Sequence, residues 1–147
     1  MCSANILLIE DNVADVELTK RTFREVGIDL KLNVAFDADA GLSFLNSIDD
    51  LENHGPSLIL LDLNLPKKNG LELLQELKAN TKFAYIPVII LSCSQNPEDI
   101  REAYKSLASA YLHKSIDRKE YIETVREFKN YWLDTVALSN KQPLGDC

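Results

Sequence analysis

The run Ser57-Leu-Ile-Leu-Leu-Asp62, followed by Leu63-Asn-Leu-Pro-Lys-Lys-Asn-Gly70, decides the fold. Four consecutive aliphatic residues, closed by a carboxylate and then by a loop containing Pro and Gly, are typical of a strand that is buried on both faces. Strands of this kind form the centre of parallel sheets. The pattern therefore predicts a parallel sheet whose central strand carries an acid, Asp62, at its C-terminal end.

Other apolar segments also end in polar or charged groups. These groups are the acid pair Glu10–Asp11, the hydroxyl of Ser92 and the ammonium of Lys114. In parallel α/β sheets the C-terminal ends of the strands share one edge, and ligand sites lie there. We therefore expect three carboxylates, one hydroxyl and one ammonium to meet at a single edge of the sheet.

Strand and helix patterns alternate along the chain, which predicts an α/β fold with helices on both faces of a parallel sheet. The predicted strands cover residues 5–9, 30–35, 57–62, 87–92 and 110–113. The predicted helices run over 14–26, from a cap at Asp37, over 70–79, from a cap at Asn96, and from 117 past Trp132. Residues 47–56 are acidic and turn-rich, which predicts a loop. One domain over residues 1–136 and a disordered tail over 137–147 are expected.

The predicted last helix carries apolar residues at helical spacing, and we expect these to be buried. They are Ile122, Val125, Phe128 and Trp132. Tyr131, Trp132 and Leu133 are adjacent positions of a helix and cannot all face inward, so at least one of them should be exposed.

The composition excludes several function classes. The chain has 147 residues, a net charge of −7 and no dense cluster of Lys or Arg, which argues against nucleic-acid binding. No apolar stretch approaches the roughly 20 residues that span a bilayer, and there is no signal-peptide pattern. The three cysteines are scattered, which argues against a zinc site or a disulfide framework and predicts a cytoplasmic protein.

The expected edge has the groups that phosphoryl transfer requires. Carboxylates placed close together repel one another unless a cation binds or their pKa rises, and Mg²⁺ prefers such oxygen ligands. A carboxylate can also accept a phosphoryl group as an aspartyl phosphate. Lys114 and Ser92 would then neutralise and hydrogen-bond the phosphoryl oxygens. The sequence therefore predicts Mg²⁺-dependent phosphoryl transfer.

These motifs resemble those of the receiver domains of two-component response regulators, over residues 5 to about 133. The matching elements are the acid pair Glu10–Asp11, the motif D-x-N-x-P-x-x-x-G at Asp62, Asn64, Pro66 and Gly70, the strand-end Ser92, and Tyr111 three residues before Lys114. The segments 128–136 and Lys114–Ser115 are also similar to single-domain regulators that pair with cyanobacterial-type phytochromes.

The resemblance implies a flavodoxin-like sheet, with the five strands in the order 2-1-3-4-5. It implies that a histidine kinase, here of phytochrome type, phosphorylates Asp62. Glu10, Asp11, Asp62 and the backbone carbonyl of Asn64 would hold Mg²⁺, and Ser92 and Tyr111 would form the switch pair. The chain would be a signalling protein rather than an enzyme. It would have no attached output domain, form homodimers, and act by docking to a further protein.

The chain departs from the family pattern at three positions. Glu10 stands where most receivers have Asp. Ser115 stands where most have Pro after a cis bond, and a cis bond before a non-proline residue costs about 3–4 kcal/mol, so cis and trans forms both stay open. Cys93 replaces a very small residue next to Ser92. We expect it to be a small buried side chain that hinders water near the phosphoryl group.

Two alternatives have different chemistry. A Mg²⁺-dependent phosphatase that forms an aspartyl-phosphate intermediate would have the motif D-x-D at the nucleophile, with the second Asp as general acid. In this chain Asn64 stands at that second position. A degenerate receiver would bind partners without being phosphorylated. The presence of Asp62, Ser92 and Lys114 argues against that alternative.

Overall fold

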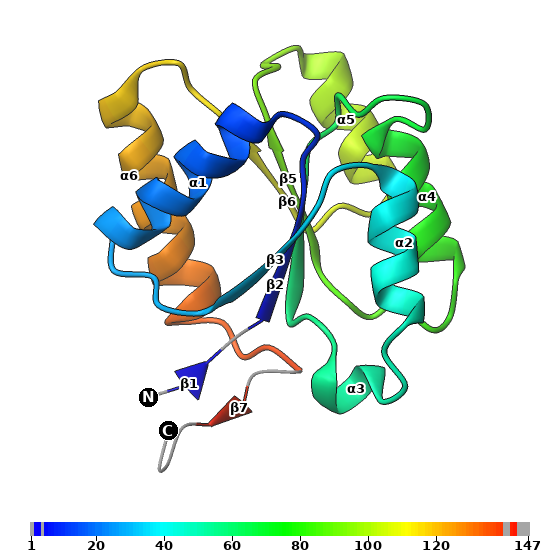
Figure 1. The fold of residues 1–147 in the computed structure, drawn as a ribbon. Helices are drawn as coiled ribbons and strands as arrows, with labels where there is room; N and C mark the ends of the chain where they lie inside the picture. The colour runs from blue at the N-terminus through cyan, green and yellow to red at the C-terminus, as the bar shows by residue number, and fades with distance from the viewer. Residues whose placement is uncertain (1, 4, 140–141, 144–147) are drawn as a thin grey trace.

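The computed structural model describes residues 2–3, 5–139 and 142–143, and it contains one five-stranded parallel sheet (Figure 1). The strands lie in the order β3-β2-β4-β5-β6. Their bounds are β2 (Asn5–Ile9), β3 (Lys31–Ala35), β4 (Leu58–Leu61), β5 (Val88–Ser92) and β6 (Ala110–His113). Numbered by their sequence order within this sheet, they follow 2-1-3-4-5, so the predicted doubly wound fold is confirmed.

Helices cover both faces of the sheet (Figure 1). On one face lie α1 (Val13–Glu25) and α6 (Arg118–Phe128), and on the other lie α2 (Ala38–Asn46), α4 (Gly70–Ala79) and α5 (Pro97–Lys105). The side chains of β4 alternate between the two layers. Leu58 and Leu60 pack in the cluster under α1 and α6, whereas Ile59 and Leu61 pack in the opposite cluster. This two-sided burial explains the continuous apolar run in the sequence.

The helix starts predicted from cap residues are confirmed. The Asp37 carboxylate accepts the amide of Ala40 at 2.7 Å, and the Asn96 side chain accepts the amide of Glu98 at 2.9 Å, with Pro97 at the first helical position. These bonds satisfy amides that have no partner inside the helix.

Two helices end in the same backbone motif with different residues at its left-handed position. At the end of α1 this residue is Gly27 (φ 82°), and the Ile28 amide donates to the Phe23 carbonyl. At the end of α5 the same position is taken by Leu107 (φ 75°), and the Ala108 amide donates to the Ala103 carbonyl. Glycine is the usual residue there because it has no Cβ. Leu107 is strained by comparison, and its side chain is 64% exposed.

The segment 47–56, predicted as a loop, contains one additional turn of helix, α3 (Leu51–His54). The Asp50 carboxylate caps this turn by accepting the amide of Asn53 at 3.4 Å. The acidic residues that suggested a loop therefore include a helix cap, and the loop prediction was wrong at these four positions.

The last helix changes its winding. After Phe128 it continues as a π-helix, η1 (Lys129–Leu133), in which the Asp134 amide donates to the Lys129 carbonyl five residues earlier. The wider turn brings Leu133 into the core, while Trp132 is half-buried and packs against the same cluster. Ile122 is also half-buried, so the prediction of full burial was wrong at these two positions.

The rest of that stripe is confirmed. Val125 and Phe128 are buried, together with Tyr121, which the helical spacing did not single out. Tyr131 is 57% exposed, as expected for one member of the adjacent trio.

Outside the main sheet, β1 (Cys2–Ser3) pairs antiparallel with β7 (Gln142–Pro143). This pairing gives residues 142–143 a structure that the predicted disordered tail did not include. Residues 140–141 and 144–147 of that tail lie outside the described residues, so the prediction stays open for them. Within the described part of the chain, no helix combines the length and apolar character that crossing a bilayer requires.

Candidate functional site

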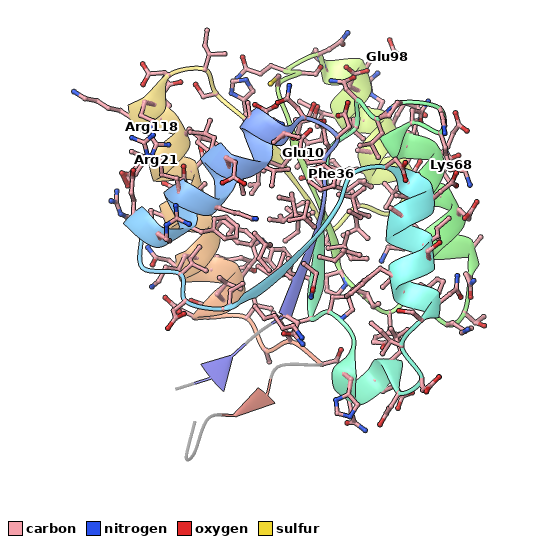
Figure 2. The ribbon with its side chains drawn as sticks, in the orientation of Figure 1. Glu10, Arg21, Phe36, Lys68, Glu98 and Arg118 are labelled. Atoms are coloured by element: carbon pink, nitrogen blue, oxygen red, sulfur yellow. The ribbon has the colours of Figure 1, made fainter. Side chains whose placement is uncertain are left out.

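Three charged residues follow directly after β2, β4 and β6 of the sheet. Backbone hydrogen bonds extend the sheet by one residue at each place. The Glu10 amide donates to Ala35 at 3.0 Å, the Asp62 amide to Ile9 at 3.0 Å, and the Lys114 amide to Ser92 at 2.7 Å. Figure 2 shows Glu10 at this upper edge of the sheet. The sheet itself therefore fixes the positions of Glu10, Asp62 and Lys114.

The three predicted carboxylates meet at this edge. Glu10, Asp11 and Asp62 each offer an oxygen atom, and these oxygens lie within 4.8 Å of one another. Glu10 and Asp62 are buried, whereas Asp11 is exposed and opens the cluster to solvent. Carboxylate oxygens at this spacing, with an open side, fit a divalent cation that keeps some of its water ligands.

The electrostatics of the cluster favour binding of a cation. Burial, together with the hydrogen bond and the charge of Asp62, raises the pKa of Glu10 to about 7. Two buried carboxylates in contact disfavour each other's charged form. A divalent cation bound between them would relieve that repulsion.

Lys114 is the buried positive charge at the edge. Its ammonium donates hydrogen bonds to Glu10 and to Asp15 Oδ2 (3.3 Å), and it lies 3.8 Å from Asp62 Oδ2. Burial alone would lower the pKa of Lys114, but the hydrogen bond to Glu10 and the charges of Asp62, Glu10 and Asp15 outweigh it and raise the pKa. Lys114 therefore stays charged and can neutralise an anion at Asp62.

Ser92 and Asn64 lie beside the cluster. Ser92 is fully buried at the end of β5, and its hydroxyl accepts the amide of Ser94 at 3.2 Å. The Asn64 amide donates to Asp62 Oδ1 at 3.1 Å. Both residues line a cavity of about 230 Å³. The edge therefore has space next to a hydroxyl and next to the loop that follows Asp62.

Gly70 explains the last position of the D-x-N-x-P-x-x-x-G motif. A Cβ atom at Gly70 would lie 2.3 Å from the Asp62 carbonyl oxygen and 2.6 Å from Leu63 Cα. The Gly70 amide also donates to the Leu63 carbonyl at 2.9 Å. The first turn of α4 therefore packs directly on the backbone of Asp62, and a side chain there would displace the acid.

Tyr111 connects β6 with the loop after β5. It is half-buried, and its hydroxyl donates to the Ser94 carbonyl at 2.9 Å. Its amide donates to the Tyr104 hydroxyl at 3.1 Å. Tyr111 thus contacts the segment that directly follows Ser92.

The structure resolves the two open departures. No peptide bond between described residues is cis, so the Lys114–Ser115 bond is trans. Cys93 is exposed, and the expectation of a small buried side chain was wrong. The physical reason is that β5 ends at Ser92, so Cys93 already lies in the loop beyond the strand that the two core layers bury.

Sequence reasoning missed one member of the site, Asp15. This residue lies in the first turn of α1, four positions after Asp11, so the helix that starts at the edge returns it to the edge. That spacing is the signal that could have identified it. Acids are common in the first turn of a helix because the helix dipole favours them there, so the sequence alone offered no reason to expect that Asp15 contacts Lys114.

Comparisons with known proteins agree with this geometry. Residues 6–126 match the model of the response regulator receiver domain. The chain is 40% identical to the response regulator Rcp1 of Synechocystis sp. over 134 residues, covering 90% of this chain and 91% of that protein. The Mn²⁺-bound crystal structure of Rcp1 superposes with a TM-score of 0.80 at 39% identity, covering 92% of this chain and 98% of that chain. The phosphorylated cyanobacterial phytochrome response regulator RcpA gives a TM-score of 0.81 at 34% identity with the same coverage.

Proposed function

The chain belongs to the response regulator receiver family, and on that premise we propose that Asp62 is its phosphoacceptor. The observation that carries the proposal is the combination of charges at Asp62. Asp62 is one of three acids suited to a cation, and the Lys114 ammonium lies 3.8 Å from its Oδ2. Both features would neutralise the oxygens of a phosphoryl group on Asp62.

The transfer is an exchange of one bond to phosphorus for another. A carboxylate oxygen of Asp62 forms the new O–P bond while the N–P bond to the histidine of a kinase breaks. Lys114 donates to one phosphoryl oxygen, and the Ser92 hydroxyl donates to another. These side chains act by positioning the phosphoryl group and neutralising its charge. The chain therefore works as a signalling protein that promotes its own phosphorylation and dephosphorylation.

Substitution of the acceptor tests the assignment. Asp62→Asn should abolish labelling by acetyl phosphate or by a kinase, because the amide has nearly the same shape but is not a nucleophile. Asp39→Asn, which changes an exposed acid on α2, is the matched control and should label normally. Circular dichroism should show both variants folded. Strong acid-labile labelling of Asp62→Asn would place the acceptor elsewhere.

We assign Mg²⁺ to the cluster of Glu10, Asp11 and Asp62, with the Asn64 backbone carbonyl as a further ligand. When bound, the cation supplies charge neutralisation for the phosphoryl oxygens. Asp11→Asn should weaken Mg²⁺ binding by at least about ten-fold. Lys114→Ala should leave Mg²⁺ binding largely intact and impair phosphorylation. Calorimetry can compare the two, and equal losses of Mg²⁺ affinity would contradict this division of roles.

Ser92 and Tyr111 are proposed as the switch pair. Ser92 would turn toward the phosphoryl group, and the hydrogen bond between Tyr111 and Ser94 would respond because the two serines are two residues apart. Tyr111→Phe should therefore accept phosphate while losing part of the conformational response. Amide hydrogen exchange of the segment after Ser92, compared with and without beryllofluoride in the wild type and in Tyr111→Phe, provides the measurement.

The donor is proposed to be a sensor histidine kinase of phytochrome type, acting in the cytoplasm. The support is the similarity to Rcp1 and to RcpA, the second of which is a phytochrome response regulator. A phytochrome kinase should transfer phosphate to this chain faster than a chemotaxis kinase at equal concentration. Faster transfer from the chemotaxis kinase would contradict the pairing.

We also propose a homodimer through the face that includes α5, β6 and the last helix. Tyr131 is exposed there and packs edge-on against Trp132 at 5.6 Å between ring centroids. Soluble proteins tend to cover such aromatic surface, and a two-fold interface places the same patch on both subunits.

Tyr131→Ser should weaken association without unfolding. A monomeric wild type at high micromolar concentration, with and without beryllofluoride, would exclude the dimer. Truncation after Asn130 is a poorer test because it also removes the buried Leu133.

A further inference from the structure

Lys114 is shared among three carboxylates, and one of them does not belong to the acid cluster. The ammonium contacts Glu10, lies 3.3 Å from Asp15 Oδ2, and lies 3.8 Å from Asp62 Oδ2. The Asp15 carboxylate is therefore closer to the ammonium than the acceptor carboxylate is. Asp15 approaches from α1, whereas Asp62 directly follows β4.

Asp15 is held firmly by its own helix. Its amide donates to the Asn12 side chain at 3.1 Å, which caps α1. Below it, α1 is cross-linked to α6 by the buried hydrogen bond between Thr19 and Tyr121, at 2.9 Å. Because α1 is anchored in this way, Asp15 cannot follow the ammonium if Lys114 moves toward Asp62.

A second cross-link lies farther along α1. The Arg118 guanidinium donates to Thr22 Oγ1 at 2.6 Å and pairs with Glu25 at 2.7 Å. Figure 2 shows Arg118 at the first turns of α6, beside α1. Asp15 therefore belongs to the more rigidly connected layer of the molecule, whereas the ammonium sits at the end of a flexible four-carbon stem.

We propose that Asp15 is a positioning residue that holds the Lys114 ammonium toward α1, in competition with the oxygens of a phosphoryl group on Asp62. The inference rests on the proposed role of Asp62. An ammonium has three donors in a compact head, so a hydrogen bond to Asp15 draws it toward α1 and limits its approach to Asp62. Asp15 thereby weakens the contact between Lys114 and the phosphoryl group and limits how tightly the active form is held.

Removal of the Asp15 charge tests the competition. With Mg²⁺ saturating for each variant, Asp15→Asn should bind beryllofluoride about two- to five-fold more tightly, as expected for a half-exposed ion pair. Glu17→Gln is the matched control, because it removes an exposed acid from the same helix without touching Lys114. Its beryllofluoride affinity should equal that of the wild type.

The same substitution in a Lys114→Ala background separates positioning from general charge. If Asp15 acts through Lys114, Asp15→Asn should change nothing once the ammonium is gone. An equal gain in both backgrounds would overturn the proposal, and so would unchanged or weaker beryllofluoride binding by Asp15→Asn in the wild-type background.

A measurement without ligand keeps the test independent of the phosphorylation assignment. The ¹⁵N signal of the Lys114 ammonium should shift in Asp15→Asn and stay fixed in Glu17→Gln. An unmoved signal in Asp15→Asn would show that the contact is absent in solution and would overturn the proposal. If the signal shifts but Asp62→Asn still accepts phosphate, the acceptor assignment fails while the contact stands.

Discussion

Both helical layers pack on the sheet through apolar clusters, but the helices within each layer are joined to one another by different means. Between α1 and α6, directional bonds cross the layer, namely the buried Thr19–Tyr121 hydrogen bond and the bonds of Arg118. On the other face, α2, α4 and α5 pack through a large apolar cluster, and the Gln75–Ser106 hydrogen bond between α4 and the end of α5 is exposed. Bonds with fixed directions resist sliding, whereas apolar contacts can slip by small steps. We therefore expect the α1/α6 layer to hold Lys114 and Asp15 in place and the α4/α5 layer to move more readily.

The largest expected effect concerns Gly70, where α4 meets the edge backbone to backbone. Gly70→Ala should lower the free energy of unfolding by about 3 kcal/mol, because its Cβ would overlap the Asp62 carbonyl. It should also abolish phosphorylation, since Asp62 must shift. Chemical denaturation and acetyl-phosphate labelling provide the two readouts.

Gly27→Ala is the matched control for that substitution. It adds the same methyl group at a left-handed position, but nothing lies within 4 Å of the added atom. Gly27→Ala should therefore lower the free energy of unfolding by only about 1 kcal/mol, the cost of backbone strain, and phosphorylation should be normal. If Gly27→Ala cost as much stability as Gly70→Ala, the close contact at Asp62 would not explain the loss.

A smaller effect is expected from breaking the directional bond of the α1/α6 layer. Tyr121→Phe removes one hydroxyl and leaves the buried Thr19 hydroxyl without that partner, which should cost about 1–2 kcal/mol. Gln75→Ala breaks the exposed hydrogen bond on the opposite layer and should cost less than about 0.5 kcal/mol. Equal losses in urea denaturation would mean that the two layers do not differ in this respect.

The expected difference in mobility between the two layers predicts which backbone amides respond to activation. Beryllofluoride with Mg²⁺ should change amide hydrogen exchange by about three-fold or more within residues 93–113. The amides of α1 and α6 should change less, because their cross-links persist. Mass spectrometry of peptic fragments can compare these regions. Larger changes in α6 than in α5 would reverse the assignment of rigid and mobile layers.

The smallest effect is expected at Cys93. Its exposed side chain follows Ser92 at the edge and should partly shield the phosphoryl group from water. Cys93→Ala should therefore shorten the lifetime of the aspartyl phosphate by about two-fold, a difference of about 0.4 kcal/mol in the barrier. An unchanged or longer lifetime would show that the thiol points away from the path of water.

The parallel sheet and most of the edge could be predicted from the sequence because each relies on a local pattern with one structural outcome. A run such as Leu58–Leu61, apolar at every position, requires burial on both faces, and parallel strands bring Glu10 and Asp62 to one edge. The receiver resemblance supplied the strand order. Lys114 followed from the same reasoning because it ends another apolar segment, which forms β6.

The misses arose where tertiary packing decides between similar local patterns. The 3.6-residue periodicity of an α-helix predicted a buried Trp132. The π-helical turn, however, rotates the residues that follow Phe128, and Leu133 is the one that packs in the core. For Cys93, an apolar strand before it suggested burial, whereas the strand had already ended. Asp15 matched the ordinary preference for acids in a first helical turn, so its sequence position did not reveal its contact with Lys114.

The leucine at the left-handed end of α5 has a consequence for how the chain tolerates change. Replacing Leu107 by glycine would relieve roughly 1 kcal/mol of backbone strain, but glycine would gain roughly 0.5–1 kcal/mol of freedom in the unfolded chain. The two terms nearly cancel, so folding selects only weakly between the residues. In evolutionary terms position 107 is free to drift with respect to stability, and whatever side chain it carries is set by the surface it presents rather than by the fold beneath it.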